Sequence, residues 1–374
     1  MISFVASLRS IAHHSRYYEG NITMFDLDRV KLLPRELKNQ AVYIFTRLTN
    51  PVYRIFHRSN VAFMYIEHPI ILPFVLKIRR YLGVPIHFLS PEADFSQYRK
   101  VIIPNGLWPS VKLATDRIPA EKRLYCEIGF MPQTKNVYFD PKGVHGHSST
   151  RDIALTPLAQ PEKEKLDNYR AQITDSNFVR VKWDSIDLAN EDAEANSYDF
   201  EFVFVPLQLE EDTAFELCPF DSNQEIITYI ENALPGKKIL FKVHPSDSNT
   251  RYAVQDRNLL LPRSNKNLKA LLTHCSAVVA SNSTVILEAL LLEKKCATFG
   301  IGFTTNHHLA LECHEDLSRL SNLDEWEPVA WKNDSFLYAM FERQFSIEFP
   351  DYPEEMQKLT SYLNEQGIPV QEPS

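Results

Sequence analysis

The segment Val278–Gly300, VVASNSTVILEALLLEKKCATFG, decides the fold of this chain. Its apolar run 278–280 predicts a buried strand, and the polar residues 281–284 predict a turn. The stretch 285–292 then predicts a helix, and 296–299 a second strand closed by glycine. Strand, turn, helix and strand in this order form one βαβ unit of a parallel sheet. We therefore expect an α/β fold.

The turn of this unit is a candidate phosphate site. The N–H groups at the start of the helix face whatever lies beyond the carboxyl end of the strand, and they favour anions. Ser283 and Thr284 add hydroxyl groups beside them. Glu288 follows one helical turn later on an otherwise apolar helix, so it is either solvated or bound to a hydroxyl-bearing ligand such as a ribose. The alternative is that Ser283 and Thr284 only cap the helix.

Length and charge exclude several classes of protein. A chain of 374 residues is too long for one ordinary core and suits two domains. Hydrophobic residues make up 44% of it, which is typical of a folded protein. The net charge of -8 argues against a general nucleic-acid binder, so we expect no nucleic acid among its partners.

The cysteines and the N-terminus predict where the protein works. Five scattered cysteines, mostly in apolar runs, are typical of reduced buried thiols, which favours the cytoplasm. Arg9 and two histidines interrupt the N-terminal segment where a signal peptide would be apolar, and no stretch reaches the ~20 apolar residues of a membrane span. Residues 1–16 are mildly amphipathic and basic, so they predict a surface helix or a peripheral contact with the cytoplasmic face of the inner membrane.

The first half of the chain alternates strands with helices. We expect helices over 36–57, 70–83 and 156–175, strands over 61–66, 85–89, 101–104 and 124–128, and a long loop over 129–152. The acidic residues 184–199 read as a solvated connection between two domains.

The second half repeats the alternation. We expect strands over 200–206, 239–243, 278–280 and 296–299, and helices over 223–233, 267–274, 285–292, 334–345 and 352–366. The predicted domains are an N-terminal Rossmann-like domain (1–198), a C-terminal Rossmann-like domain (199–330), and C-terminal helices that pack back on the first domain (331–374).

Three strand ends of the second half meet at one sheet edge. They place Gln208 to Asp212, His244 and the turn 281–284 together, and Glu127 from the first half supplies a second carboxylate across a cleft. Two carboxylates that face the anomeric centre of a sugar are the working parts of glycosyl transfer with retention. The alternatives are that Asp212 is one member of an acidic loop and that His244 only caps a turn.

Missing motifs narrow the chemistry. The sequence has no GxxxxGK[ST] and no GxGxxG after a strand, which excludes P-loop enzymes and disfavours dinucleotide oxidoreductases. It has no CxxC pair and no HExxH, the spacings typical of zinc sites. Asp26-Leu27-Asp28 resembles a metal-binding D-x-D but follows no clear strand. We therefore expect metal-independent chemistry without a cofactor.

Four motifs occur in an order that resembles the bacterial capsule polysaccharide biosynthesis family, the retaining β-Kdo transferases. They are CEIGFMPQTKNVYFDPKGVHGHSS (126–149), FVFVPLQLEEDTAF (202–215), FKVHPSD (241–247) and SNSTVILEALLLEKKCATFG (281–300). The resemblance covers roughly residues 120–305. It implies a GT-B-like fold with two Rossmann-like domains facing a cleft. It also implies transfer of Kdo from CMP-β-Kdo to an oligosaccharide or glycolipid acceptor, with β linkage, through a covalent Kdo–Asp intermediate.

The resemblance also implies roles for individual residues. Asp212 would be the nucleophile, Glu127 the acid/base, and His244 would lie beside the leaving phosphate or the Kdo carboxylate. The expected substrate-binding residues are Gln208, Lys242, Asn282, Ser283, Thr284, Glu288, His145 and Ser148, with the phosphate at 282–284 and the ribose at Glu288.

The loop 143–147 reads Gly-Val-His-Gly-His, which departs from the capsule-initiating members and leaves the acceptor open between O-antigen (lipopolysaccharide) and capsule pathways. Two other functions also stay open. One is another GT-B sugar-nucleotide enzyme, either a transferase or an epimerase, and the other is a non-catalytic scaffold that binds glycan or lipid.

Overall fold

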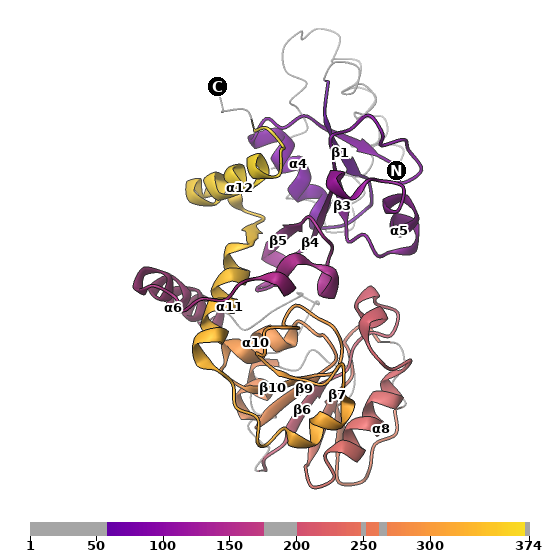
Figure 1. Ribbon diagram of the computed structural model, residues 1–374, viewed down its shortest axis with the longest axis vertical. Helices are drawn as coiled ribbons and strands as arrows, with labels where there is room; N and C mark the ends of the chain where they lie inside the picture. The colour runs from indigo at the N-terminus through magenta and orange to yellow at the C-terminus, as the bar shows by residue number, and fades with distance from the viewer. Residues whose placement is uncertain (1–57, 176–199, 248–251, 262–267, 371–374) are drawn as a thin grey trace, which may run out of the picture. The chain divides into compact units, whose positions relative to one another are not determined.

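The computed structural model describes residues 58–175, 200–247, 252–261 and 268–370 (Figure 1). Several predicted features lie outside the described residues. These are the amphipathic segment 1–16, the Asp26-Leu27-Asp28 element, the helix 36–57, the acidic connection 184–199 and the boundary between 198 and 199. The domain limits therefore stay a prediction.

A six-stranded mixed sheet forms the first half. Its strands are β1 (Val61–Met64), β2 (Ile86–Leu89), β3 (Lys100–Pro104), β4 (Arg123–Ile128), β5 (Asn136–Asp140) and β12 (Gln344–Ser346), in the order β12-β5-β4-β3-β1-β2. The first four are parallel, whereas β5 runs antiparallel to both of its neighbours, β4 and β12. The order reverses between β1 and β3, so loops from opposite directions meet there.

A second six-stranded sheet, entirely parallel, follows in the chain (Figure 1). Its strands are β6 (Val203–Pro206), β7 (Ile239–Lys242), β8 (Leu259–Leu261), β9 (Ala277–Ala280), β10 (Lys295–Thr298) and β11 (Leu311–Glu312), in the order β11-β10-β9-β6-β7-β8. This is the strand order of dinucleotide-binding folds, with its reversal between β6 and β9. The predicted α/β fold with two Rossmann-like halves is confirmed.

Helices connect the strands of both sheets. They are α4 (Ile71–Tyr81), α5 (Pro109–Thr115), α6 (Gln160–Asp175), α8 (Asn223–Ala233), α9 (Leu268–His274), α10 (Val285–Leu291), α11 (Ala330–Glu342) and α12 (Pro353–Glu365). Helix α8 shows why these boundaries arise. The Ser222 hydroxyl accepts a hydrogen bond from Glu225 N, and Ile226, Ile227 and Ile230 form a buried apolar face.

The strands of the second sheet are buried on both faces, as expected when helices cover a parallel sheet. Alternate residues of β6 point to opposite cores, so Phe204 packs in one apolar cluster and Val203 and Val205 in another. Each such side chain contributes about 1.5–3 kcal/mol when fully buried. The period-two pattern therefore fixes which residues of each strand face which layer.

The C-terminal segment returns to the first sheet, but not as the helix that we predict over 334–345. Helix α11 ends at Glu342, and Phe345 lies in β12, where it pairs antiparallel with Val137 of β5. Phe345 is 1% exposed, so its apolar side chain is buried from a strand rather than from a helix. The prediction is wrong at this end because strand and helix both bury an isolated phenylalanine.

Contacts with helix α6 stabilise the position of the C-terminal segment. The Arg170 guanidinium of α6 lies 2.7 Å from the Asp334 carboxylate of α11, and the rings of Tyr169 and Phe341 stack with centroids 4.8 Å apart.

All five cysteines are unpaired and four of them are buried, with Cys218 partly exposed. Across the described ranges, no helix combines the length and apolarity that a membrane crossing needs.

Candidate functional site

The carboxyl ends of β6, β7 and β9 lie side by side in the second sheet, and each carries residues predicted from the sequence (Figure 1). Residues 207–212 follow β6, His244 follows β7, and 281–284 follow β9. Since the strand order reverses between β6 and β9, the loops after these two strands flank the crevice where α/β proteins bind ligands. The shared edge is therefore the candidate donor site.

Asp212 and Asn282 are linked through one backbone unit at this edge. The Asp212 carboxylate caps the short helix 213–217 by accepting a hydrogen bond from Ala214 N at 2.9 Å. The Ala214 carbonyl in turn accepts a hydrogen bond from Asn282 Nδ2 at 2.7 Å. Asp212 itself is exposed to solvent. The loop after β6 thus holds an accessible carboxylate beside the turn after β9.

Two buried oxygen atoms face this edge without a hydrogen-bond partner within the described ranges. They are Asn282 Oδ1 and Gln208 Oε1. The Asn282 amide nitrogen is fixed by two carbonyls, those of Ala214 and Ile301, so its oxygen cannot exchange places with the nitrogen. A buried acceptor without a donor costs about 1–3 kcal/mol. A ligand that supplies donors would remove this cost.

In the turn after β9, one of the two hydroxyl residues caps the helix and the other does not. Ser283 Oγ accepts a hydrogen bond from Val285 N at 3.3 Å, so Ser283 does cap α10. Thr284 does not cap the helix, and its hydroxyl accepts a hydrogen bond from Gln133 Nε2 at 3.4 Å. Glu288 is only 3% exposed on a helix that is buried at every position, so the alternative of a solvated Glu288 is wrong.

His244 is held by the turn that follows it. Its Nδ1 accepts a hydrogen bond from Ser246 N at 3.1 Å, which leaves the proton of the neutral ring on Nε2. The side chain therefore caps a turn and presents an N–H donor at the same time. Lys242, the last residue of β7, is buried two positions earlier.

Glu127 ends β4 at the corresponding edge of the first sheet. It is 5% exposed. Its Oε2 accepts a hydrogen bond from Asn105 Nδ2 at 2.7 Å, and its Oε1 accepts one from Ile128 N at 2.8 Å. The carboxylate is thus buried and oriented by two donors, on the strand next to β3, where the strand order of the first sheet reverses.

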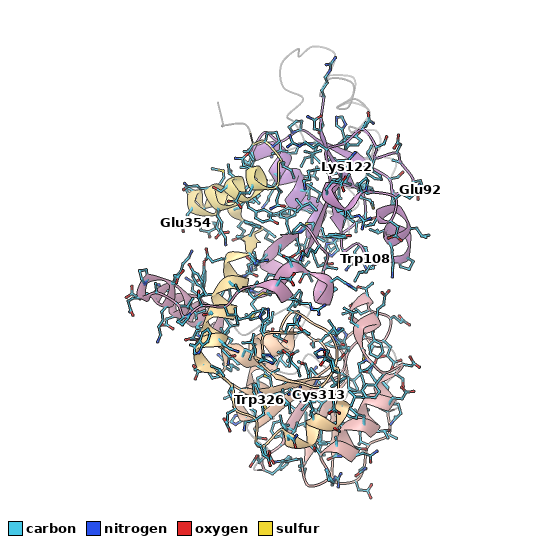
Figure 2. The ribbon with its side chains drawn as sticks, in the orientation of Figure 1. Glu92, Trp108, Lys122, Cys313, Trp326 and Glu354 are labelled. Atoms are coloured by element: carbon cyan, nitrogen blue, oxygen red, sulfur yellow. The ribbon has the colours of Figure 1, made fainter. Side chains whose placement is uncertain are left out.

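The sequence reasoning missed the residues around Glu127. His68 follows β1, and its Nδ1 accepts hydrogen bonds from Ile70 N and Ile71 N at the start of α4. Its ring stacks on that of Trp108, the N-cap residue of α5, with centroids 6.2 Å apart. Trp108 is labelled in Figure 2. Burial lowers the pKa of His68, and the charge of Glu127 opposes the shift.

One signal for His68 was present in the sequence. A His-Pro pair follows a strand at residues 68–69, as another does at 244–245.

The loop 143–152 is built around a buried carboxylate, Asp140. Its two oxygens accept hydrogen bonds from Lys142 N, Gly143 N, Ser149 N and Ser149 Oγ. The predicted substrate residue Ser148 is buried, and its hydroxyl bonds to Thr150. The other, His145, places its ring 6.0 Å from that of Phe303. The roles of both residues stay predictions.

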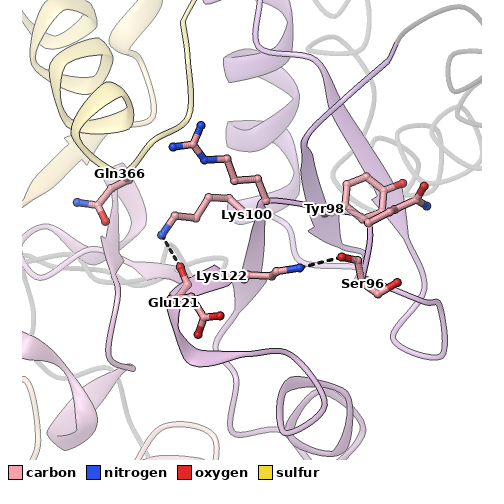
Figure 3. A pocket seen from close by; sticks show the side chains of 8 residues that line it. Ser96, Tyr98, Lys100, Glu121, Lys122 and Gln366 are labelled. Atoms are coloured by element: carbon pink, nitrogen blue, oxygen red, sulfur yellow. Dashed lines mark hydrogen bonds between the residues drawn. The ribbon is translucent and has the colours of Figure 1, made fainter.

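A separate pocket of about 480 Å³ lies at the opposite, amino-terminal ends of β3 and β4 (Figure 3). Lys100 and Lys122 line it, and they donate hydrogen bonds to the backbone oxygens of Glu121 and Ser96. Ligands of α/β sheets bind at carboxyl ends. The pocket is therefore distinct from the candidate site.

The fold and the two sheet edges define a GT-B-like α/β protein. Residues 162–315 match the family model described as "Capsule polysaccharide biosynthesis protein". This segment contains all three loops of the candidate donor site, and its match agrees with the family predicted from the sequence.

Two known proteins are similar to this chain in sequence or in fold. Protein FixF of Sinorhizobium fredii is 26% identical over 237 residues, which cover 62% of this chain and 55% of FixF. The chain thus spans about half the length of that relative. The β-Kdo 2,4-transferase of KpsC from Thermosulfurimonas dismutans matches with a TM-score of 0.53 and 16% identity, over 75% of this chain and 91% of that one. The similarity to this structure supports the fold.

Proposed function

We propose that this chain is a retaining glycosyltransferase that moves Kdo from CMP-β-Kdo to a hydroxyl group of an oligosaccharide or glycolipid, with β linkage. The acceptor belongs to an O-antigen (lipopolysaccharide) or capsule pathway. The chain works in the cytoplasm, with peripheral contact to the inner membrane. No cofactor or metal takes part, because the donor groups of the protein balance the charge of the phosphate.

One observation carries the proposal. Asp212, His244 and Asn282 come from three different loops and lie at the carboxyl edge of three adjacent parallel strands, at the strand-order reversal of the second sheet. All three fall within the segment that matches the family model. An accessible carboxylate, a fixed N–H donor and a polar turn are the groups that attack on a sugar phosphate requires.

In the first step, an Asp212 oxygen attacks the anomeric carbon of Kdo. The bond from this carbon to the phosphate oxygen breaks, and its electron pair leaves with CMP. The His244 Nε2–H and the N–H groups after β9 donate to the departing phosphate. Asp212 is exposed in the free protein. The desolvation expected of a nucleophile therefore accompanies donor binding.

In the second step, the acceptor hydroxyl attacks the same carbon from the face that CMP left. Glu127 takes the hydroxyl proton, and the bond between the sugar and Asp212 breaks. Two inversions restore the β configuration. No electrons are gained or lost overall, so the reaction needs neither oxidant nor reductant.

The covalent adduct tests the proposal. We expect that the protein incubated with CMP-β-Kdo and no acceptor gains the mass of one Kdo residue in intact-mass spectrometry, and that peptide mapping places it on Asp212. Glu127→Gln should increase the adduct, because the second step slows while the first does not. Asp212→Asn should abolish it and still bind CMP.

The opposite outcomes identify the alternatives. No adduct on wild type or on Glu127→Gln would overturn the double displacement. An adduct on another peptide would move the nucleophile to Glu211, which is exposed, or to Glu210, whose carboxylate accepts a hydrogen bond from Asn223 N. If Asp212→Asn performs the biological function of the wild type equally well, the protein is better described as a non-catalytic glycan- or lipid-binding scaffold.

A further inference from the structure

Asn105 is the buried partner of the Glu127 carboxylate. It is 4% exposed and directly follows β3, with a left-handed backbone at φ 55°. Its side-chain oxygen accepts a hydrogen bond from Leu107 N at 3.0 Å, and its backbone N–H donates to the Cys126 carbonyl at 2.9 Å. These bonds fix the amide so that Nδ2 points at Glu127 Oε2, 2.7 Å away.

The left-handed conformation restricts the residue type at this position. Asn, Asp and Gly adopt it readily, whereas other residues are strained there. Asp would place a second carboxylate against Glu127, and Gly would leave Glu127 Oε2 without the amide donor. Asn is therefore the residue that satisfies both the backbone and the carboxylate.

The other titratable groups whose pKa is shifted by the charge of Glu127 are neutral near pH 7. They come from three elements and are His68 after β1, Cys126 in β4 and Tyr138 in β5. Burial lowers the pKa of His68, with Glu127 opposing the shift. Burial followed by the charge of Glu127 raises the pKa of both Cys126 and Tyr138 well above their ordinary values. A neutral donor such as the Asn105 amide therefore matters for stabilising the anion here.

We propose that Asn105 is a positioning residue that holds the Glu127 carboxylate in the orientation in which it takes the proton of the acceptor hydroxyl. This inference rests on the proposed function. Each carboxylate oxygen has two lone-pair sites. Asn105 and Ile128 N occupy one on each oxygen, which leaves the others for the acceptor hydroxyl.

The variant Asn105→Asp tests the proposal with little change in shape. An aspartate oxygen can still accept the bond from Leu107 N and tolerates the left-handed backbone. Two carboxylates at hydrogen-bond distance share a proton. We expect the acidic limb of the pH profile of kcat for steady-state CMP release at saturating CMP-β-Kdo, which includes the second step, to move up by at least about one pH unit.

Asn364→Asp is the matched control. Asn364 is exposed, and its side-chain oxygen accepts a hydrogen bond from Val370 N at 3.1 Å, so the same exchange keeps a similar bond without a carboxylate partner. Its pH profile should equal that of wild type.

A second readout does not depend on activity. Carbon-13 NMR of protein labelled at the Glu side-chain carboxyl groups, with Glu127→Gln for assignment, follows the titration of Glu127 directly. The midpoint should move upward in Asn105→Asp. If the Glu127 midpoint moves in Asn105→Asp but the wild type releases no CMP, the interaction between residues 105 and 127 is supported and the proposed function is refuted. If the wild type releases CMP but neither the Glu127 midpoint nor the pH profile moves in Asn105→Asp, the proposed role of Asn105 is wrong.

Asn105→Gly covers the case in which the aspartate variant fails to fold. Glycine keeps the left-handed backbone without strain and removes the amide. We expect kcat for steady-state CMP release to fall about 10- to 100-fold, because Glu127 loses its fixed orientation in the second step, while CMP affinity stays at the wild-type value. A wild-type kcat in this variant would also overturn the proposal.

Discussion

Two histidines, His68 and His244, end strands in different sheets and are bound in the same way. In each ring, Nδ1 accepts backbone N–H groups of the residues that follow. A neutral imidazole bound in this way keeps its proton on Nε2, so it acts as a fixed donor rather than as a proton acceptor. In the proposed mechanism, this geometry suits His244 to charge stabilisation, with Glu127 and Asp212 as the groups that exchange protons or bonds.

His307 links protonation to stability. It is 6% exposed and lies 2.7 Å from the Thr150 carbonyl through Nε2. Burial lowers its pKa, although the bond to Thr150 and the charges of Glu312 and Asp152 oppose the shift. The unfolded chain therefore binds this proton at a higher pH than the folded chain does, and stability falls as the pH drops below the ordinary histidine pKa of 6.5.

We expect His307→Gln to flatten this dependence. The glutamine amide can still donate to Thr150 but does not titrate. Between about pH 7 and about pH 5.5, the urea midpoint of the variant should fall less than that of wild type, whose His68 and His147 are shifted in the same direction by burial. His308→Gln, at an exposed neighbour, should keep the wild-type slope. Equal slopes for wild type and His307→Gln would contradict the assignment.

At the scale of elements, the loop 143–152 packs against the loop after β10 through a glycine. A Cβ on Gly146 would lie 2.5 Å from the Ile301 carbonyl oxygen and 2.7 Å from Leu217 Cδ1. The Ile301 oxygen belongs to the backbone, and Ile301 N donates to the Leu217 carbonyl, so these atoms cannot move aside cheaply. This contact explains the second glycine of the Gly-Val-His-Gly-His sequence.

Gly146→Ala should therefore destabilise the protein by about 1–3 kcal/mol through overpacking, seen as a melting temperature several degrees lower by calorimetry. Gly236→Ala is the control, because a Cβ at Gly236 would meet no atom within 4 Å beyond its own chain neighbours. It should leave the melting temperature unchanged or raise it slightly. Equal melting temperatures for Gly146→Ala and Gly236→Ala would refute the close approach at Gly146.

The sequence predicts the long, regular elements well. Helix α8 runs over the residues predicted for it, and the strands that carry the donor edge differ by one to three residues at their starts or ends. It does not predict β8 and β11, which have three and two residues. Such short edge strands bury too few side chains to produce a period of their own. Strand β5 lies within the polar segment 129–152, which we predict as a loop.

For the whole molecule, the order of the strands could not be read from their sequence. The reversal between β6 and β9 depends on how strands separated by more than seventy residues pair, which is a long-range property of the sheet. Local patterns did place polar residues at the ends of β6, β7 and β9, so their meeting at one edge of the second sheet was predicted. They did not connect Asn105, His68 and Trp108 with Glu127, because these residues meet only through the pairing of β1, β3 and β4.

The nature of the donor follows from the donor edge as a whole and can be tested on the intact chain. A single turn after β9, without a glycine-rich diphosphate loop, suits a nucleoside monophosphate better than a diphosphate. A ligand present at 100 times its Kd stabilises the folded state by about 2.7 kcal/mol. We therefore expect CMP to raise the melting temperature by several degrees, and UDP and GDP at the same concentration to raise it less.

Two variants separate binding from chemistry in this measurement. Asp212→Asn should keep the full shift with CMP, since its role begins only with the sugar, whereas Ser283→Ala should reduce the shift because the hydroxyl lies in the phosphate turn. Each shift is taken relative to the same variant without nucleotide, which removes the loss of the Ser283 cap on Val285 N. A larger shift with UDP or GDP would replace CMP-Kdo by another sugar nucleotide, and the absence of any shift would favour the non-catalytic scaffold.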